Sequence, residues 1–385
     1  MTNRILLVAN WDWVLYNFRL PLARALEEAG LDVLLVCPSG EYFERIKDEG
    51  FQLVAWNLER RSTSPFKEWL AMRHLLRLYR ELNPAAVHHF TIKPIVYGSV
   101  AARLADIPRV FNNFTGLGFL FTNTLKARLL RALVAPVVRL ADRGDSFVTL
   151  FQNEHDRDQL ISHHVVQAER VFVIPGTGVD LKKFTAQRGR QARQAPVVLM
   201  ASRLLLDKGV REFVEAASQL RQAGVAATFQ LAGQIDEGNP AHVPPRMLEQ
   251  WMVQGVVEFL GHRADMPELL RQADIAVLPS YHEGVPLFLL EAAASGLPIV
   301  ATDIAGCRIV VEDGENGLLV PVKDAAALAA ALKSLIENPK LRARMGDNSR
   351  IVAASKFGID SILEQYLEVF RQFGVLEASS TEAGA

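Results

Sequence analysis

The chain has 385 residues, of which 50% are hydrophobic and 22% are charged, and its formal net charge is −1. This length suits two domains with substantial cores, and the composition excludes an intrinsically disordered chain. Two cysteines, Cys37 and Cys307, fit a reducing compartment, and no apolar run approaches the ~20 residues of a membrane span, so we expect a cytoplasmic protein without a nucleic-acid partner.

Short apolar runs alternate with amphipathic stretches through the first half of the chain. This pattern predicts strands of a parallel sheet with helices between them. The first strand, Ile5–Ala9, is followed by an expected loop at Asn10–Asn17 and a helix from about Phe18 to Ala29. Further strands are predicted at Val33–Cys37, Leu53–Trp56, Ala86–His89, Arg109–Asn112, Phe147–Phe151 and Val171–Pro175. Residues 1–180 thus predict a doubly wound domain, and the missing G-x-G-x-x-G fingerprint argues against a hydride-transfer enzyme.

The alternation stops at residues 181–196, which are polar and basic and predict a linker. It restarts over residues 197–357, which predict a second doubly wound domain. Its strands are expected at Val197–Met200, Ala227–Ala232, Val256–Leu260, Ile275–Leu278, Ile299–Ala301 and Leu318–Val320. A last helix is expected at about 358–374, and residues 376–385 have the composition of a disordered tail.

One stretch of the second domain combines a loop with a well-delimited helix. The loop Tyr281–Pro286 follows a predicted strand, and Leu287–Ser295 is a Leu/Ala-rich helix that Gly296 ends. Such a loop lies at the carboxyl ends of the strands, where α/β sheets bind ligands. Backbone N–H groups at about Val285–Phe288 are suited to a phosphate or diphosphate.

Two carboxylates flank this helix start, Glu283 and Glu291. At a helical rise of ~1.5 Å per residue they would lie at most ~12 Å apart, which suits the ribose and the sugar of a nucleotide-sugar. The alternative is a core helix with two incidental surface glutamates.

The same stretch resembles a known enzyme family. The segments "EGVPLFLLE", "DIAVLPSYHEG" and "EAAASGLPIVATDIAG" are similar to the E-x7-E region of retaining family 4 glycosyltransferases. The resemblance implies the GT-B fold, in which two Rossmann-like doubly wound parallel-sheet domains face a cleft, the second domain binding the nucleotide-sugar and the first the acceptor. It also implies that helix 358–374 crosses back onto the first domain, that a UDP-sugar is the donor, and that no cofactor is needed.

The resemblance also implies roles for particular residues on the donor side. Glu283 would orient the transferred sugar and Glu291 would bind the ribose, while Arg203 and Lys208, in a pattern like R-x4-K-G, would stabilise the departing diphosphate. The alternative for the two cations is that they are solvated loop residues. Further donor-binding candidates are Gly284, Val285, Pro286, Leu287, Phe288, Gly233, His262 and Arg263. The alternative for Gly233 is a plain strand-end turn.

Acceptor-side candidates come from loops of the first domain and are expected to face the cleft: Asp12, Tyr16, Arg19, Lys93, Asn113 and Thr115. The segment "NNFTGLG" lacks the histidine that family 4 enzymes often carry there, so that role is not transferred. His88 and His89 are expected to be packed or hydrogen-bonded structural groups.

Asp156-Arg157-Asp158 is the one match in the sequence to the Asp-x-Asp metal-binding pattern of other glycosyltransferases. This segment is better explained as the first turn of a helix, where acids stabilise the helix dipole. We therefore expect no metal.

The segments "HHFTIKPIVYG" and "FNNFTGLGFLF" resemble a subgroup that extends polyprenyl-diphosphate-linked saccharides, which implies a lipid-linked saccharide acceptor in bacterial surface glycan assembly. Residues 1–186 carry 23 Lys and Arg against 19 Asp and Glu, whereas the remaining residues carry 19 against 24. Residues 125–143 and the helix around Trp69 and Leu75 are basic and amphipathic, so we expect the first domain to lie on the anionic inner face of the membrane. Alternatively, both helices pack on the sheet with their cations in solvent. Three alternative hypotheses for the function of the chain stay open: a nucleotide-sugar epimerase, a transferase to a soluble acceptor, and a catalytically inert scaffold.

Overall fold

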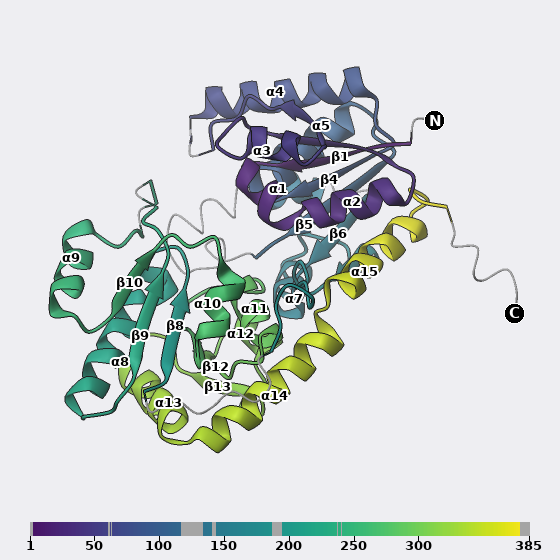
Figure 1. Cartoon of the computed structure of the whole chain (residues 1–385). Coiled ribbons are helices and arrows are strands. Elements are labelled where there is room, and N and C mark those ends of the chain that lie inside the picture. The colour runs from purple at the N-terminus through teal and green to yellow at the C-terminus, as the bar shows by residue number, and fades with distance from the viewer. Residues whose placement is uncertain are drawn as a thin grey trace, which may run out of the picture. The chain divides into compact units, whose positions relative to one another are not determined.

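The computed structural model describes residues 3–60, 62, 64–116, 134–140, 144–186, 195–236, 238–239 and 241–377. The chain divides into two compact units: unit 1 comprises residues 1–177 with 362–385, and unit 2 comprises residues 178–361 (Figure 1). Residues 187–194 of the expected linker and 378–385 of the expected tail lie outside the described residues.

Unit 1 is built on a sheet of seven parallel strands in the order β3-β2-β1-β4-β5-β6-β7. The strands are β1 (Arg4–Ala9), β2 (Asp32–Cys37), β3 (Gln52–Ala55), β4 (Ala86–Phe90), β5 (Arg109–Phe114), β6 (Phe147–Phe151) and β7 (Val171–Val173). All are short and rich in apolar residues, because helices cover both faces of the sheet.

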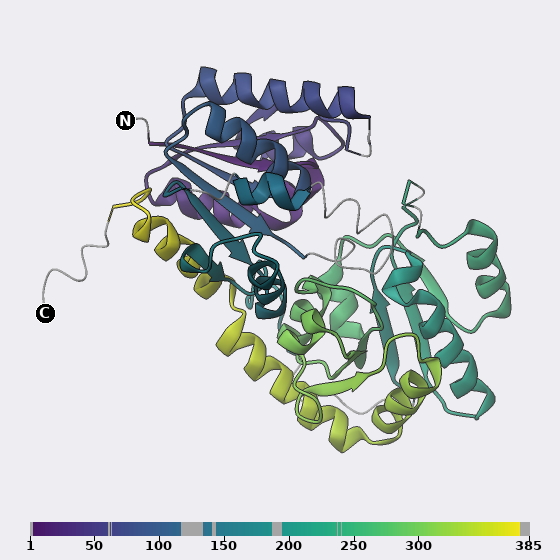
Figure 2. The ribbon, with the colours of Figure 1, turned by 180° about the vertical axis from the view of Figure 1, so that it is seen from behind.

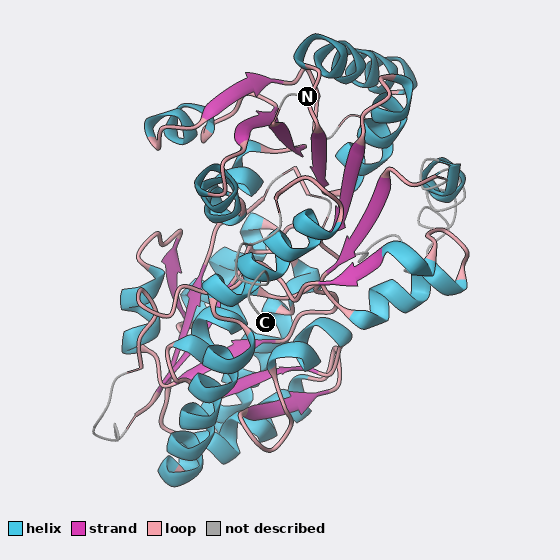
Figure 3. Cartoon of the chain, turned by 90° about the vertical axis from the view of Figure 1, so that its right-hand side faces the viewer, coloured by secondary structure: helices cyan, strands magenta, loops and turns pink. Residues whose placement is uncertain are grey.

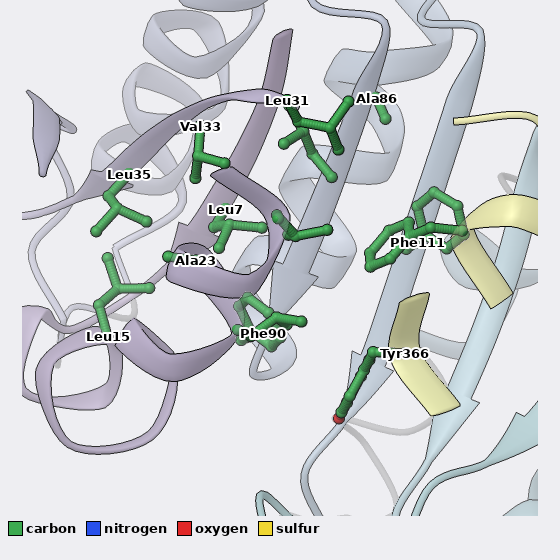
Figure 4. Close-up of a cluster of buried hydrophobic side chains, with 14 of the residues drawn as sticks. Leu7, Leu15, Ala23, Leu31, Val33, Leu35, Ala86, Phe90, Phe111 and Tyr366 are labelled. Carbon is green, nitrogen blue, oxygen red and sulfur yellow. The ribbon is translucent and has the colours of Figure 1, made fainter. Parts of the chain in front are cut away.

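Alternate residues of each strand point to opposite faces, and each face has its own core. Ile5 and Leu7 of β1 face α1 (Asp12–Phe18), α2 (Leu20–Glu28), α3 (Phe43–Asp48) and α15 (Ile359–Gln372), and Figure 4 shows part of this cluster. Leu6 and Val8 face α4 (Pro65–Leu82) and α5 (Ser99–Leu104). The other helical segments of unit 1 are a π-helix at Pro94–Gly98, a helix at 134–140, α7 (Glu154–Ser162) and a 3-10 turn at Ala168–Arg170.

Unit 2 contains a second parallel sheet, of six strands in the order β10-β9-β8-β11-β12-β13. Its strands are β8 (Val197–Ala201), β9 (Thr228–Ala232), β10 (Glu258–Gly261), β11 (Ile275–Leu278), β12 (Ile299–Thr302) and β13 (Gly317–Val320). The helices are α8 (Val210–Gln222), α9 (Pro245–Gln254), α10 (Met266–Gln272), α11 (Leu287–Ala294), α12 (Ala305–Val310), α13 (Ala325–Glu337) and α14 (Pro339–Lys356). One core lies between the sheet and α8 and α13, and the other between the sheet and α10, α11, α12 and α14, so both faces are covered (Figure 3).

The expected fold class is confirmed, and each predicted strand is present with ends within two residues of those expected. The expected loop at Asn10–Asn17 is wrong, because α1 occupies most of it. The carboxylate of Asp12 accepts hydrogen bonds from the amides of Trp13 at 2.9 Å and Tyr42 at 2.7 Å. The contact with Tyr42 joins residues 30 positions apart, so local sequence patterns could not reveal this helix start.

The Asp-x-Asp segment is confirmed as the first turn of a helix. Asp156 lies in the first turn of α7, and its amide donates to the side chain of the N-cap residue Asn153 at 2.7 Å. Among the described residues, no group of three or more His, Cys, Asp and Glu side chains is arranged to hold a metal ion.

Candidate donor and acceptor sites

The candidate donor site of unit 2 lies where the strand order reverses. The chain leaves β8 toward β9 on one side and later returns to β11 on the other, so β8 and β11 are neighbours from which successive connections diverge. Ligands of open α/β sheets bind at the carboxyl ends of such strands. The loop after β8 carries Arg203 and Lys208, and the loop after β11 carries Glu283, so the topology brings the three predicted residues to one edge.

Lys208 and Glu283 form an ion pair across this point. The Lys208 ammonium donates to Oε1 of Glu283 at 2.5 Å, and their side chains are only 17% and 14% exposed. Such partly desolvated, charge-assisted hydrogen bonds are stronger than exposed ones. The next residue, Gly209, has φ +74°, and a Cβ there would overlap the carbonyl oxygen of Pro279, so only glycine permits this approach of the two loops.

Arg203 points toward a different neighbour. Its Nη1 donates to Oδ2 of Asp236, in the loop after β9, at 3.2 Å. Asp236 was not predicted. It follows a strand in "LAGQIDEG", and the end of a strand at this edge was the signal that could have identified it.

A second layer of contacts holds the β11 loop in place. The Tyr281 hydroxyl donates to Oε1 of Glu212 on α8 at 2.6 Å, and the Tyr281 amide donates to the carbonyl of Asp207 at 2.8 Å. Burial, and then the bond to Glu212, raise the pKa of Tyr281. Lys323 lies over the Tyr281 ring at 5.0 Å. These four residues were not predicted, although Tyr281 belongs to the "SYHEG" segment.

The start of α11 offers backbone rather than side-chain groups. Pro286 is its N-cap and has no N–H. It therefore cannot be one of the backbone donors expected at Val285–Phe288. Phe288 is buried, and Val285 and Leu287 pack against the same core. Their amides lie at the helix start, where first-turn donors lack intrahelical acceptors. A Cβ on Gly306 of α12 would overlap the carbonyl oxygens of Glu283 and Gly284, so α12 supports this loop closely.

Glu291 lies midway along α11 and is partly buried. Burial raises its pKa from 4.5 to about 7, and the charge of Lys183 opposes this rise. The helical spacing assumed between Glu283 and Glu291 does not hold over the whole interval, because α11 begins only at Leu287.

The remaining donor-side candidates lie at the ends of β9 and β10. A Cβ on Gly233 would overlap the carbonyl oxygen of Ser202, and its φ is +152°, so the protein's own backbone accounts for this glycine. Arg263 donates to Asp265 at 2.7 Å, and His262 is exposed. Neither the ion pair of Arg263 nor the exposure of His262 indicates a ligand.

Three acceptor-side candidates lie on or next to α1 rather than in a loop: Asp12 and Arg19 are buried, and Tyr16 is partly buried. Asp12 is buried against the Gly40–Tyr42 turn, and the Tyr16 ring packs on Tyr42 at 5.1 Å. Arg19 is 2% exposed, with its guanidinium 4.3 Å from the Phe90 ring. Burial lowers the pKa of Arg19, and a hydrogen bond with Tyr366 opposes this.

Asn113 and Thr115 lie at the end of β5. The Asn113 amide nitrogen donates to the Tyr366 hydroxyl at 2.7 Å, which links the strand to α15. Thr115 is partly buried just after the strand, and residues 117–133 lie outside the described residues. These contacts give Asn113 a structural partner.

Lys93 has a full set of protein partners. Its ammonium donates to both Glu68 carboxylate oxygens, at 2.8 and 3.0 Å, and to the carbonyls of Glu59 and Ser62. This favours a role in holding the 57–64 segment against α4.

The two histidines of β4 are structural, as expected. His89 lies 2.8 Å from both the Tyr79 hydroxyl and Oδ1 of Asn112. His88 is buried among aromatic rings, with Phe90 at 4.1 Å, and burial holds its pKa well below 6.5.

Two family profiles together match most of the chain. Residues 182–352 match the family profile described as glycosyl transferases group 1, and residues 4–143 match glycosyl transferase 4-like. The chain is 31% identical, over 92% of its own length and 95% of the relative's, to N,N'-diacetylbacillosaminyl-diphospho-undecaprenol alpha-1,3-N-acetylgalactosaminyltransferase of Campylobacter jejuni. It is 26% identical, over 88% and 89%, to UDP-Gal:alpha-D-GlcNAc-diphosphoundecaprenol alpha-1,3-galactosyltransferase of Escherichia coli. The crystal structure of Anabaena HepE in complex with UDP-glucose superposes with a TM-score of 0.76 at 21% identity, over 96% of this chain and 99% of HepE.

Proposed function

This chain belongs to the group 1, family 4 glycosyltransferases and has their GT-B fold, and we propose that it moves a hexosyl group from a UDP-sugar to a lipid-linked saccharide. The observation that carries the proposal is the Lys208–Glu283 pair at the switch point of the unit 2 sheet, with Arg203 in the same loop after β8 as Lys208. The names of the Campylobacter and Escherichia relatives support the lipid-linked acceptor and leave an N-acetylhexosaminyl donor open.

The donor would bind through unit 2. Arg203, Lys208 and the first amides of α11 supply positive charge and donors for the diphosphate, which removes the need for a divalent ion. Glu283 would accept hydrogen bonds from sugar hydroxyls, and Glu291 from the ribose. The HepE structure with UDP-glucose supports a UDP-sugar of this general kind.

We infer that transfer retains the anomeric configuration. The acceptor oxygen would bond to the anomeric carbon on the face from which UDP departs, as the bond from that carbon to the donor phosphate oxygen breaks. A phosphate oxygen would take the hydroxyl proton, so no protein nucleophile is required. The two cations would stabilise the charge that grows on the leaving diphosphate.

The acceptor's lipid places the reaction at a membrane, and we infer a peripheral position on the inner, anionic leaflet. No helix in the described part of the chain combines the length and hydrophobicity needed to cross a bilayer. Of the two basic segments expected to dock, residues 125–133 and 141–143 lie outside the described residues, whereas α4 is described in full.

Product analysis with a panel of UDP-sugars and a polyprenyl-diphosphate-linked saccharide tests this function. We expect one UDP-sugar to lengthen the acceptor by one residue, and NMR of the product to show the donor's anomeric configuration. An inverted product would remove the retention claim. Epimerised sugar released without any acceptor would overturn the transferase assignment.

A further inference from the structure

Unit 1 exposes large apolar side chains on one helix. On the first two turns of α4, Phe66 is 67% exposed, Trp69 45% and Leu70 44%. The Phe66 and Trp69 rings stack at 6.2 Å. Single exposed apolar residues are ordinary, but a contiguous group of this size marks an interaction surface.

Packing within unit 1 does not account for these three residues. The inward side of α4 is formed by Ala71, Leu75, Leu78 and Tyr79, which are buried against the sheet. Leu75, expected on the membrane-facing side with Trp69, is therefore a core residue. No other described helix or strand of unit 1 lies over the outer side of α4, at the top of Figures 1 and 2.

Arginines continue the same side of α4 beyond the aromatic group. The Arg73 guanidinium lies 4.7 Å over the Trp69 ring, and Arg73 and Arg77 together line two adjoining hollows beside α4. The acids nearby are few: Glu59 pairs with Lys67 at 2.5 Å, and Glu81 lies 3.7 Å from Arg77. We call Phe66, Trp69, Leu70, Arg73 and Arg77 the α4 patch.

The surface continues onto neighbouring helices. Arg80 donates to the carbonyl of Leu104 at 3.1 Å, and Arg103 donates to the carbonyl of Leu140 at 3.2 Å. Leu104 and Leu140 are themselves exposed. Within the described part of unit 1, every exposed large apolar side chain therefore belongs to α4, to the end of α5 or to the 134–140 helix. Each group has an arginine beside it.

We propose that the α4 patch is the membrane-docking surface of this protein, with α4 lying parallel to an anionic bilayer. Phe66, Trp69 and Leu70 enter the interfacial region, and Arg73 and Arg77 bind lipid phosphates. An exposed Trp and Phe followed by guanidinium groups suit the boundary between the acyl chains and the anionic head groups of a bilayer. The inference rests on the proposed function only in that a lipid-linked acceptor supplies the reason to dock.

Co-sedimentation with vesicles tests the patch directly. We expect the full chain to bind phosphatidylcholine vesicles containing about 30% phosphatidylglycerol, to bind pure phosphatidylcholine weakly, and to lose binding in about 0.5 M salt. The variants Phe66→Ser/Trp69→Ser/Leu70→Ser and Arg73→Glu/Arg77→Glu should each lower the bound fraction at least about fivefold.

A matched control uses another exposed group on unit 2. Arg246→Glu/Met252→Ser/Val253→Ser on α9 changes the same kinds of side chain and should bind like the wild type. Unchanged melting temperatures would show that the two patch variants are folded. The apolar variant and the arginine variant then test the proposal separately. If both are folded and still bind anionic vesicles fully, or if the wild type ignores them, the patch is not a membrane surface.

Activity in detergent separates this inference from the proposed function. The patch variants should transfer sugar to a detergent-solubilised acceptor at the wild-type rate and lose transfer only to acceptor held in vesicles. Wild-type transfer in detergent without vesicle binding would overturn the patch and leave the function. Patch-dependent vesicle binding without any transfer would overturn the function and leave the patch.

Discussion

The ammonium of Lys208 lies 2.5 Å from Oε1 of Glu283, although 75 residues separate them in the chain. Arg203, which lies in the same loop after β8 as Lys208, pairs instead with Asp236 at 3.2 Å. The two cations proposed to hold the donor diphosphate thus have different protein partners, and substitutions can distinguish them.

A double-mutant cycle should detect the first pair. We expect Lys208→Ala and Glu283→Ala to be coupled by about 1–3 kcal/mol in the free energy of unfolding, because either single change leaves a partly buried charge unpaired. Arg203→Ala with Glu283→Ala is the control, and it should be additive within about 0.5 kcal/mol. Urea unfolding of the six proteins measures both terms, and equal coupling in the two cycles would contradict the pairing.

The two glutamates of the E-x7-E stretch should separate kinetically. Glu283→Ala should lose far more kcat than Glu291→Ala, because only Glu283 is proposed to contact the reacting sugar. Glu291→Ala should act on donor affinity, by about 1–3 kcal/mol for a lost hydrogen bond to a charged group. Steady-state kinetics over a series of donor concentrations checks this, and a Glu283→Ala enzyme with wild-type kcat for every donor would refute the assignment.

Glycosyl transfer should persist in excess chelator. Arg203, Lys208 and backbone amides are proposed to balance the diphosphate charge without a divalent ion. The measurement is the initial rate with and without EDTA, after dialysis against chelator, and with Mg²⁺ or Mn²⁺ restored. Loss of activity in EDTA that either ion reverses would establish a metal requirement.

Glu291 should make the stability of unit 2 fall as pH rises. Its folded pKa of about 7 lies above the ordinary value of 4.5, so between these values the folded state binds more protons than the unfolded state. The free energy of unfolding therefore decreases through this window. Glu291→Gln, which imitates the protonated form, should exceed the wild type by less than about 1 kcal/mol near pH 5 and by about 2–3 kcal/mol near pH 8.

Denaturant unfolding at the two pH values measures this difference. Glu249→Gln on the exposed side of α9 is a suitable control and should show no such dependence. A Glu291→Gln protein whose advantage is the same at both pH values would show that its carboxylate ionises normally.

The sequence predicted the strands well because their signal is local. Ile275–Leu278 is four apolar residues between turn residues, and burial of both faces requires nothing more. The start of α11 was equally local, with Pro286 before it and Gly296, at φ +72°, after it. The two glutamates and two cations proposed for the donor site were singled out because they stand in or beside such elements, and their roles remain predictions.

The side-chain partners were not predictable in the same way. Asp12 owes its burial to Tyr42, and Arg203 meets Asp236 only because β8 and β9 pair in the folded sheet. Arg19 was expected in a polar loop, but it lies at the junction of α1 and α2 and is buried against the Phe90 ring. Each of these contacts joins distant parts of the sequence, and no local pattern encodes them.

The bare backbone at Gly209 and Gly306 has a consequence for engineering this enzyme. Their missing Cβ atoms let the β8 loop and the start of α12 rest directly on the β11 loop, without an intervening side chain to absorb a change of shape. A chimaera that imports residues 280–286 from a relative with another sugar preference should therefore misfold locally unless residues 203–209 and the first turn of α12 are transplanted with it. Donor preference in this scaffold would be exchanged as a three-part module.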